Sequence, residues 1–493
     1  MQITDQLEKE IVQKYRKLDY RCYEEPLTYD IISRISQNPG EKIRMIYWKL
    51  CEMLKIVILL IGYLLIFQQV SSLLIVIFLV FLIPMLYENY KAGCLWYDLY
   101  SKQTVDERKI SYYEKLLTEK TSLAELKVYQ TAAYIEKLWK KQSSKLEKEK
   151  DETLDKVKRS LLKKSIFAAL WYLCSAGLLL HGAMTGRISI GMFLAFFQTT
   201  LTIVDTINSL LETFGNFSRE IQELSYLSAF FRLENMPVQK GCLDKPVRRI
   251  RFEHVCFTYP CSEKEVLHDI NFELDVSQST AVVGGNGSGK TTIIKLLCGL
   301  YQPTSGRILF DDCDLKNLSS SEIGKVIKVV FQDFFQYEMT IRENIGFGNL
   351  DRISHDMELQ NVLDAVHLEE LKRLGLDTPL GKLEPAGIDL SRGQWQRLAV
   401  SRIFLNDTGF AVLDEPTASV DPVSEYNMYR LFYSLLKSRG SLMISHRLAS
   451  AKMADHILVL KNGTIAEQGN HTELMEKKGF YYKLFCKQAE WYQ

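Results

Sequence analysis

Long apolar stretches interrupt the polar pattern in the first half of the chain. Ile56–Tyr87 spans 32 residues without an Asp, Glu, Lys or Arg. As a helix rising about 1.5 Å per residue, this stretch is longer than one bilayer core. The polar run Gln68–Ser72 lies in its middle. We therefore expect a hairpin of two membrane spans, at about residues 45–67 and 70–92.

A second apolar hairpin is expected further along the chain. Neither Ser165–Gly186 nor Ile188–Val204 contains an Asp, Glu, Lys or Arg. This pattern predicts spans at about residues 164–182 and 187–210, within a transmembrane domain over residues 45–222. The alternative, buried core helices of a soluble protein, requires two long apolar hairpins and a charge bias to arise by accident.

The charges around the spans predict their orientation. Lys and Arg crowd residues 102–164, whereas the two hairpin tips hold only Arg187. Because Lys and Arg are enriched on the cytoplasmic side of membranes, both tips are expected to point outward. Both termini then lie in the cytoplasm, as do residues 1–44 and a charged helical loop at about residues 100–164.

The composition excludes some function classes. The chain has 61 Lys and Arg against 60 Asp and Glu, a net charge of +1, so no general basic field exists to attract nucleic acid. Its ten cysteines are scattered, with no C-x-x-C pair and no Cys/His cluster at metal spacing. We expect no nucleic-acid partner.

The pattern changes again after the last span. Residues 223–248 read as a linker, and residues 249–493 as an α/β domain. Alternating apolar residues predict a strand at Ile250–Tyr259, and Thr280–Gly284 is typical of a short buried strand that ends in glycine.

The segment after this second strand has the spacing of a phosphate-binding loop. It reads Gly-Gly-Asn-Gly-Ser-Gly-Lys-Thr and leads into a helical pattern, which is the context that a P-loop requires. Glycines let backbone N–H groups point at phosphate oxygens, and the helix N-terminus adds partial positive charge. Lys290 is expected to bridge the β- and γ-phosphates, and the Thr291 hydroxyl to bind Mg²⁺. The expected nucleotide contacts here are Gly284, Gly285, Asn286, Gly287, Ser288, Gly289, Lys290, Thr291 and Thr292.

An acidic pair follows a third buried strand, Phe410–Leu413. In a P-loop fold this position lies beside the phosphates. Asp414 is expected to hold Mg²⁺ and its water, and Glu415 to act as the catalytic base for the attacking water. The predicted fold is therefore an α-helical membrane domain of about four spans followed by an α/β P-loop NTPase domain.

The run Leu390-Ser-Arg-Gly-Gln394, shortly before this acidic pair, resembles the signature motif of ABC ATPases, normally Leu-Ser-Gly-Gly-Gln. With the P-loop and the acidic pair, this resemblance implies an ABC-type domain that uses ATP and Mg²⁺. Further site residues follow from the resemblance. They are Tyr259 stacking on adenine, Gln332 as the Q-loop residue and a Mg²⁺ ligand, Asp421 in the D-loop, His446 as the catalytic switch histidine, and Ser391, Gly393 and Gln394 facing the nucleotide of a second subunit.

A membrane domain fused ahead of the ATPase resembles exporter-type half-transporters. Tyr23–Arg34 and the segment from Glu125 look like the two cytoplasmic loops that contact the ATPase domains of such exporters. The resemblance implies a multi-pass subunit of a bacterial cell membrane that uses ATP to export an unidentified substrate through a lipid bilayer. The alternative is a membrane-anchored ABC ATPase that regulates or assembles a partner without transporting by itself.

Two departures from the family pattern carry expectations of their own. Exporters have two spans before the first loop, so four spans are expected here instead of six, and this chain alone is not expected to form a sealed transport pathway. Arg392 stands where the signature has glycine, while Glu415 and His446 are intact. This asymmetry favours a heterodimer with a second half-transporter over a homodimer.

Overall fold

The computed structural model describes the chain except for residues 1, 36–38, 71, 237–242, 244, 406–408, 416–428, 431, 435–438, 446–450 and 491–493. Its contacts divide the chain into two compact units. One unit comprises Met1–Gln13 and Ser33–Arg232, and the other comprises Lys14–Ile32 and Leu233–Gln493. A short N-terminal segment therefore belongs to the same unit as the second half of the chain.

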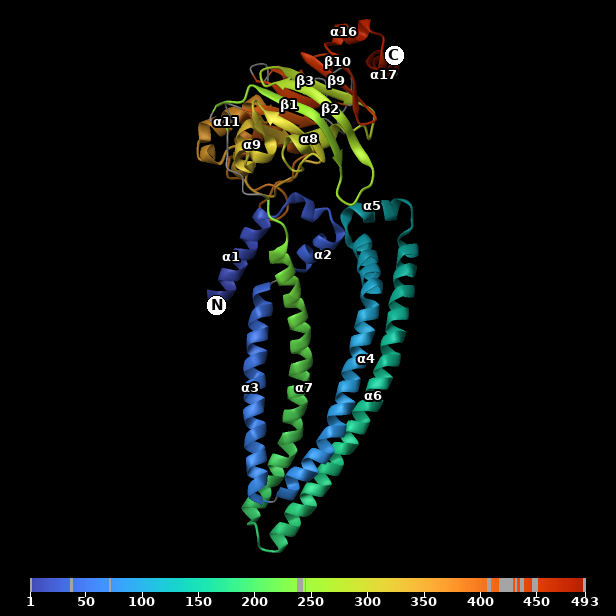
Figure 1. Ribbon diagram of the computed structural model, residues 1–493, viewed down its shortest axis with the longest axis vertical. Coiled ribbons are helices and arrows are strands. Elements are labelled where there is room, and N and C mark those ends of the chain that lie inside the picture. The colour runs from blue at the N-terminus through green and yellow to red at the C-terminus, as the bar shows by residue number, and fades with distance from the viewer. Residues whose placement is uncertain are drawn as a thin grey trace. The chain divides into compact units, whose positions relative to one another are not determined.

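The first unit is built from long helices (Figure 1). The helices up to Arg232 are α1 (Gln2–Lys17), α2 (Pro26–Ile35), α3 (Pro39–Val70), α4 (Ser72–Thr118), α5 (Lys120–Val128), α6 (Ala132–Met184) and α7 (Ile190–Arg232), and most of α2 belongs to the second unit. Four of them are long and apolar enough to cross a membrane, as the sequence predicts. Their apolar segments lie within Ile43–Gln68, Ser72–Trp96, Ala132–Met184 and Ile190–Leu210.

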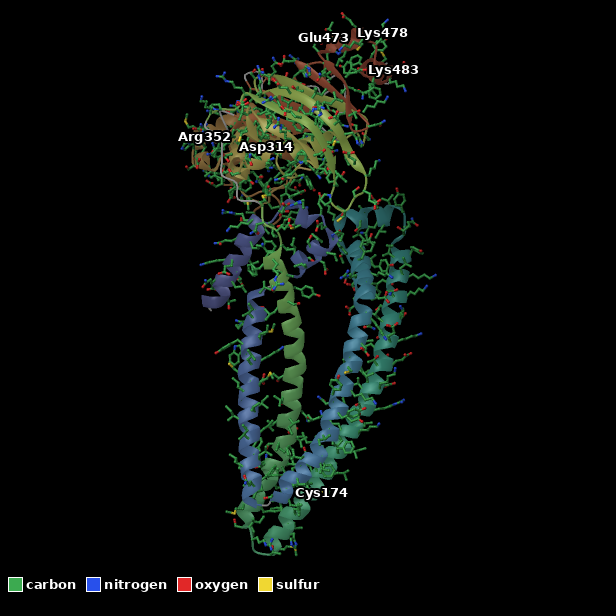
Figure 2. All side chains as sticks on the ribbon, in the orientation of Figure 1. Cys174, Asp314, Arg352, Glu473, Lys478 and Lys483 are labelled. Atoms are coloured by element: carbon green, nitrogen blue, oxygen red, sulfur yellow. The ribbon has the colours of Figure 1, made fainter. Side chains whose placement is uncertain are left out.

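The long helices pack in pairs, α4 along α6 and α3 along α7. A cluster of buried aromatic rings joins three of them, because Trp171 of α6 lies 5.9 Å from Phe67 of α3 and 5.2 Å from Phe78 of α4, ring centre to ring centre. Cys174, one turn further along α6, is exposed (Figure 2). Near one end of the apolar part of α4, the Ser160 hydroxyl of α6 donates a hydrogen bond to the buried Glu88 carboxylate.

The second unit contains the α/β domain. Its strands are β1 (Arg249–Thr258), β2 (Glu265–Asp275), β3 (Ser279–Gly284), β4 (Ser305–Phe310), β5 (Cys313–Asp314), β6 (Ile327–Val330), β7 (Phe410–Asp414), β8 (Ser441–Ile444), β9 (His456–Lys461) and β10 (Thr464–Gly469). Its helices are α8 (Lys290–Leu297), α9 (Ser320–Val326), α10 (Ile341–Gly346), α11 (Asp356–Ala365), α12 (Glu369–Leu374), α13 (Arg392–Phe404), α16 (His471–Glu476) and α17 (Phe480–Glu490), with 3₁₀ turns at Tyr20–Tyr23, Leu315–Asn317 and Leu350–Arg352.

Two sheets organise this domain. An antiparallel sheet has the order β2-β1-β4-β5, and a larger sheet has the order β10-β9-β3-β8-β7-β6, in which only β10 runs antiparallel to its neighbour. Strands β7 and β8 are buried at every residue, as expected of parallel strands covered on both faces. The alternation expected for the first strand is also present, because the side chains of β1 are alternately buried and more exposed over most of its length.

The strand order positions the predicted site. β8 lies between β3 and β7, and its Ile444 is opposite both Val282 of β3 and Asp414 of β7. The carboxyl ends of β3 and β7 therefore meet at one edge of the sheet, although they are far apart in the sequence. This is the edge at which ligands bind in open α/β folds.

Candidate nucleotide-binding and catalytic site

The loop after β3 has the backbone geometry of a phosphate cradle. Gly287 and Gly289 have φ angles of 74° and 101°, in the left-handed region that favours glycine. A Cβ on Gly284 would collide with the carbonyl oxygen of Leu460, and one on Gly289 would collide with Leu267. The glycines are therefore required both by the turn and by the close packing of its backbone.

Lys290 begins α8 and folds back over this loop. Its ammonium Nζ donates hydrogen bonds to the carbonyl oxygens of Gly284 at 3.1 Å and Gly285 at 3.0 Å. Burial lowers the pKa of Lys290, while the nearby carboxylates of Glu415 and Asp414 act in the opposite direction. The ammonium group thus lies within the cradle, between the loop and the acidic pair.

Asp414 and Glu415 lie at the end of β7, in different surroundings. Asp414 is 1% exposed, and burial raises its pKa to about 6, while a hydrogen bond from Thr291 acts to lower it. Glu415 has a φ of 45°, and its N–H donates to the carbonyl oxygen of Ile444 at 3.1 Å. Burial also raises the pKa of Glu415, opposed by Lys290. The structure therefore brings Lys290, Thr291 and both carboxyl groups together.

These residues fit a nucleoside triphosphate bound together with a divalent cation. Two buried polar atoms beside the cradle, Asp414 Oδ1 and Ser288 Oγ, have no hydrogen-bond partner among the described residues. Hard cations prefer carboxylate and hydroxyl oxygens, and the Asp414 and Thr291 side chains supply these. The glycine-lined cradle accommodates anionic oxygens.

Tyr259, expected to stack on adenine, lies just after β1. Its hydroxyl is 3.0 Å from the Thr292 hydroxyl, and its ring meets the ring of Tyr301 edge-on at 5.4 Å. The ammonium of Lys295 lies 5.2 Å from the Tyr259 ring centre. The residues that hold Tyr259 come from α8 and the loop after it. The sequence contains no signal for Tyr301 and Lys295 at this site, because their contacts with Tyr259 form only in the folded chain.

The signature residues lie at the start of α13. Ser391 caps this helix, in a reciprocal pair of hydrogen bonds with Gln394. Gly393 has open space where a Cβ would be. Arg392 is exposed and lines a hollow of about 390 Å³ together with Gln332. Ser391 and Arg392 are thus exposed, whereas Gln394 is half-buried and Leu390 is buried.

Three further expected site residues are Gln332, Asp421 and His446. Gln332 is exposed in a turn that follows β6. Asp421 and His446 lie outside the residues that the structure describes. Asp333, which the sequence reasoning missed, raises the pKa of Asp414 through its charge, so it lies close to the site.

Known proteins resemble this chain in sequence and in fold. Residues 267–418 match the ABC transporter family. The chain is 29% identical over 498 residues to the subtilin transport ATP-binding protein SpaT of Bacillus subtilis, a match covering 98% of this chain and 80% of SpaT. It is 27% identical over 493 residues to the nisin transport ATP-binding protein NisT of Lactococcus lactis subsp. lactis, covering 98% of this chain and 82% of NisT.

Two further similarities concern part of the chain and the fold. An ATP-dependent lipid A-core flippase of Nitrosococcus oceani is 35% identical over 311 residues, which cover 62% of this chain and 51% of the flippase. The structure of a bacterial Atm1-family ABC exporter with ATP bound has the same fold, with a TM-score of 0.79 at 22% identity, over 99% of this chain and 85% of that one. Homology to these ATP-binding domains implies ATPase activity coupled to transport. The chain thus joins a helical membrane domain to an ABC transporter ATP-binding domain, and it is homologous to ABC exporters of the half-transporter type.

Proposed function

We propose that this chain is one subunit of an ATP-driven exporter in a bacterial cell membrane, with its ATPase domain in the cytoplasm. The observation that carries this proposal is the convergence of Lys290 and Thr291 with Asp414 and Glu415 at one edge of the parallel sheet. The four apolar helices on the same chain supply the attachment to the lipid bilayer.

Each residue of the site has a role in this proposal. The N–H groups of the loop and the Lys290 ammonium hold the phosphates, and Thr291, Gln332 and Asp414 would hold Mg²⁺, which would neutralise charge on the phosphate oxygens. Glu415 orients the attacking water and accepts its proton, and the raised pKa of Glu415 makes it a stronger base. His446 and Asp421 keep the roles that their motifs imply.

Exporters of this family function as dimers, and we propose that this chain pairs with a different half-transporter. In such a dimer Ser391, Gly393 and Gln394 face the nucleotide bound to the partner. Arg392 replaces the glycine that allows the nearest backbone approach, so the site completed by this signature is the weaker one. A homodimer would contain this weaker site twice.

The two relatives that match along 98% of this chain are transport proteins for subtilin and nisin. We propose a substrate of the same kind. The lipid A-core flippase matches over only 62% of the chain, so it supports export in general more than lipid as the substrate.

Inside-out membrane vesicles test this function directly. Vesicles containing the chain, with and without a candidate partner, are given Mg-ATP and labelled nisin or subtilin, and uptake is followed with time. We expect uptake that requires ATP and is lost in Lys290→Ala. Vesicles that hydrolyse ATP but accumulate neither compound would reject this substrate class, and vesicles without hydrolysis would reject the function itself.

A further inference from the structure

A short N-terminal segment, residues 14–24, is hydrogen-bonded to residues 233–235, where the chain enters the ATPase unit. Lys14 is 7% exposed, and its ammonium donates to the carbonyl oxygen of Leu233 at 2.6 Å and to Asn235 Oδ1 at 2.7 Å. Leu18 forms an isolated β-bridge with Asn235. The contacts of this segment place it in the same compact unit as the ATPase domain.

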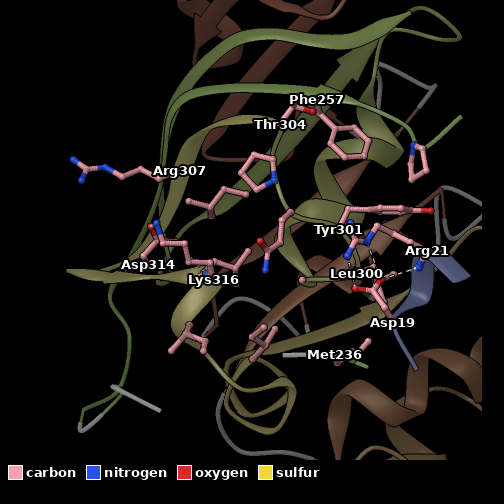
Figure 3. Close-up of a pocket in the computed structure, with 18 of the residues that line it drawn as sticks. Asp19, Arg21, Met236, Phe257, Leu300, Tyr301, Thr304, Arg307, Asp314 and Lys316 are labelled. Carbon is pink, nitrogen blue, oxygen red and sulfur yellow. Dashed lines mark hydrogen bonds and ion pairs between the residues drawn. The ribbon is translucent and has the colours of Figure 1, made fainter. Parts of the chain in front are cut away.

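The same segment also contacts the helix that follows the phosphate-binding loop. The Glu24 carboxylate lies 3.6 Å from the ammonium of Lys295, on α8. The ring of Tyr20 meets the ring of Tyr301 edge-on, with 5.6 Å between ring centres. Tyr301 also lines a hollow of about 900 Å³, beside Phe257 (Figure 3). Residues 14–24 therefore contact the elements that hold the nucleotide loop.

Lys295 is one link between this segment and Tyr259, beside Tyr301, whose ring contacts both Tyr20 and Tyr259. Its ammonium lies 5.2 Å from the ring centre of Tyr259 and 5.6 Å from that of Tyr301. A cation over an aromatic ring is attracted by the electron density of the ring face. Glu24 is the carboxylate that holds this cation in place, so its charge acts on Tyr259 through Lys295.

We propose that residues 14–24 position the adenine-binding tyrosine, with Glu24 holding Lys295 against the ring of Tyr259. This inference rests on the proposed function, because it assigns Tyr259 to the adenine base. Glu24 and Lys295 touch neither nucleotide nor reacting atoms in this scheme, so they are positioning residues. Their loss weakens recognition of the base and leaves the chemistry of hydrolysis unchanged.

The expected size of the effect follows from the exposure of the pair. The side chains of Lys295 and Glu24 are 23% and 35% exposed. Ion pairs with this degree of exposure contribute little in general, so we expect about a two- to fivefold change in ATP affinity. The effect is also expected to weaken at high salt, because exposed charges are screened.

Two ligands separate recognition of the base from recognition of the phosphates. Binding of ATP and of inorganic tripolyphosphate, which has no base, is measured by calorimetry on the full chain in lipid nanodiscs, and ATP hydrolysis is measured on the same samples. In Glu24→Gln we expect the Kd and KM for ATP to rise about two- to fivefold, with the Kd for tripolyphosphate and kcat unchanged. Lys295→Met should behave in the same way, and Lys295→Arg, which keeps the charge, should restore most of the ATP affinity.

Glu25→Gln is the matched control. Glu25 is the neighbouring carboxylate and forms no ion pair with Lys295 among the described residues, so its replacement should leave both affinities unchanged. Unchanged ATP affinity in Glu24→Gln, or an equal loss for both ligands, would overturn the inference.

Tyr259→Ala separates this inference from the proposed function. If Tyr259→Ala leaves the ratio of the two affinities unchanged, Tyr259 does not bind the base and the inference is wrong, whereas the exporter function stands. If the parent chain binds neither ligand, the proposed function fails and the inference fails with it.

Discussion

Asp414 and Glu415 are neighbours in the sequence, but burial acts on them to different extents. Asp414 is 1% exposed with a pKa of about 6, whereas Glu415 is partly exposed. At neutral pH the folded protein therefore holds a buried carboxylate in its charged form. Such a group destabilises the protein until a cation binds to it.

The loss in the free energy of unfolding caused by the charged Asp414 depends on pH, and this dependence can be predicted. The pKa of Asp414 rises from 3.8 to about 6 on folding, so the folded state binds the proton more tightly than the unfolded state. The cost is nearly absent below about pH 4, grows between pH 4 and pH 6, and is complete above pH 6, at about 3 kcal/mol. Asp414→Asn should therefore raise the melting temperature of the nucleotide-free and metal-free protein at pH 7.5, and about half as much at pH 5.

The exposed Asp351 is the control for this measurement. Asp351→Asn, compared by the same fluorescence melting at both pH values, should show no gain that depends on pH. An equal gain for Asp414→Asn at pH 5 and pH 7.5 would contradict the role of burial.

Glu415→Gln tests the catalytic base. The amide keeps the shape of the side chain and loses its basicity, and a positioned acid or base contributes typically 10²- to 10⁴-fold to the rate. We expect this variant to bind ATP normally and to hydrolyse it at a rate lower by about that factor. Lys290→Ala should instead weaken ATP binding itself. Phosphate release and nucleotide binding measured on both variants distinguish the two roles, and parental turnover in Glu415→Gln would show that another group is the base.

At the scale of elements, the signature residues lie at the start of α13, and a capping box stabilises its first turn. The reciprocal hydrogen bonds between Ser391 and Gln394 hold the first turn of α13 without help from the Arg392 side chain. A change at Arg392 therefore alters the surface that we propose meets the partner, and it keeps the helix. This separates the effect of the side chain from an effect on folding.

Arg392→Gly should raise the ATPase activity of the isolated chain, because glycine permits the nearest approach to the nucleotide of the other subunit. A partner half-transporter with the sequence Leu-Ser-Gly-Gly-Gln should raise the activity further. Ser391→Ala is the comparison, since loss of this helix cap costs about 1 kcal/mol and should lower activity. Full activity of the homodimer, with unchanged or reduced hydrolysis in Arg392→Gly, would contradict the heterodimer proposal.

At the scale of the whole molecule, the uneven distribution of Lys and Arg predicts the orientation in the membrane. In a background with the exposed Cys51, Cys174 and Cys261 replaced by alanine, Arg187→Cys places a thiol between α6 and α7. Lys150→Cys places one on α6, in the charged part of that helix. A membrane-impermeant maleimide added to intact cells should label only Arg187→Cys, and both variants should be labelled after permeabilisation. Labelling of Lys150→Cys in intact cells would show that the charged part of α6 lies outside the cell, and it would contradict the predicted orientation.

The sequence by itself determined the features that depend on neighbouring residues. A span requires only a long uncharged helix, and the phosphate loop requires glycines and a lysine at fixed spacing between a strand and a helix. Both signals are local, so the four apolar helices and the loop around Lys290 were predicted from their residues alone. The assignments of Asp421 and His446 rest on motif order and remain predictions.

The tertiary structure alone decided which residues far apart in the sequence come into contact and how far burial shifts their pKa values. The order β3-β8-β7 brings Asp414 to Lys290, and the resulting burial, which no local pattern encodes, raises the pKa of Asp414. The same holds for Glu24, which reaches Lys295 only because residues 14–32 pack with the ATPase unit. Charge and polarity are properties of each residue, but burial and contact arise from the folding of the whole chain, so these features become visible only in three dimensions.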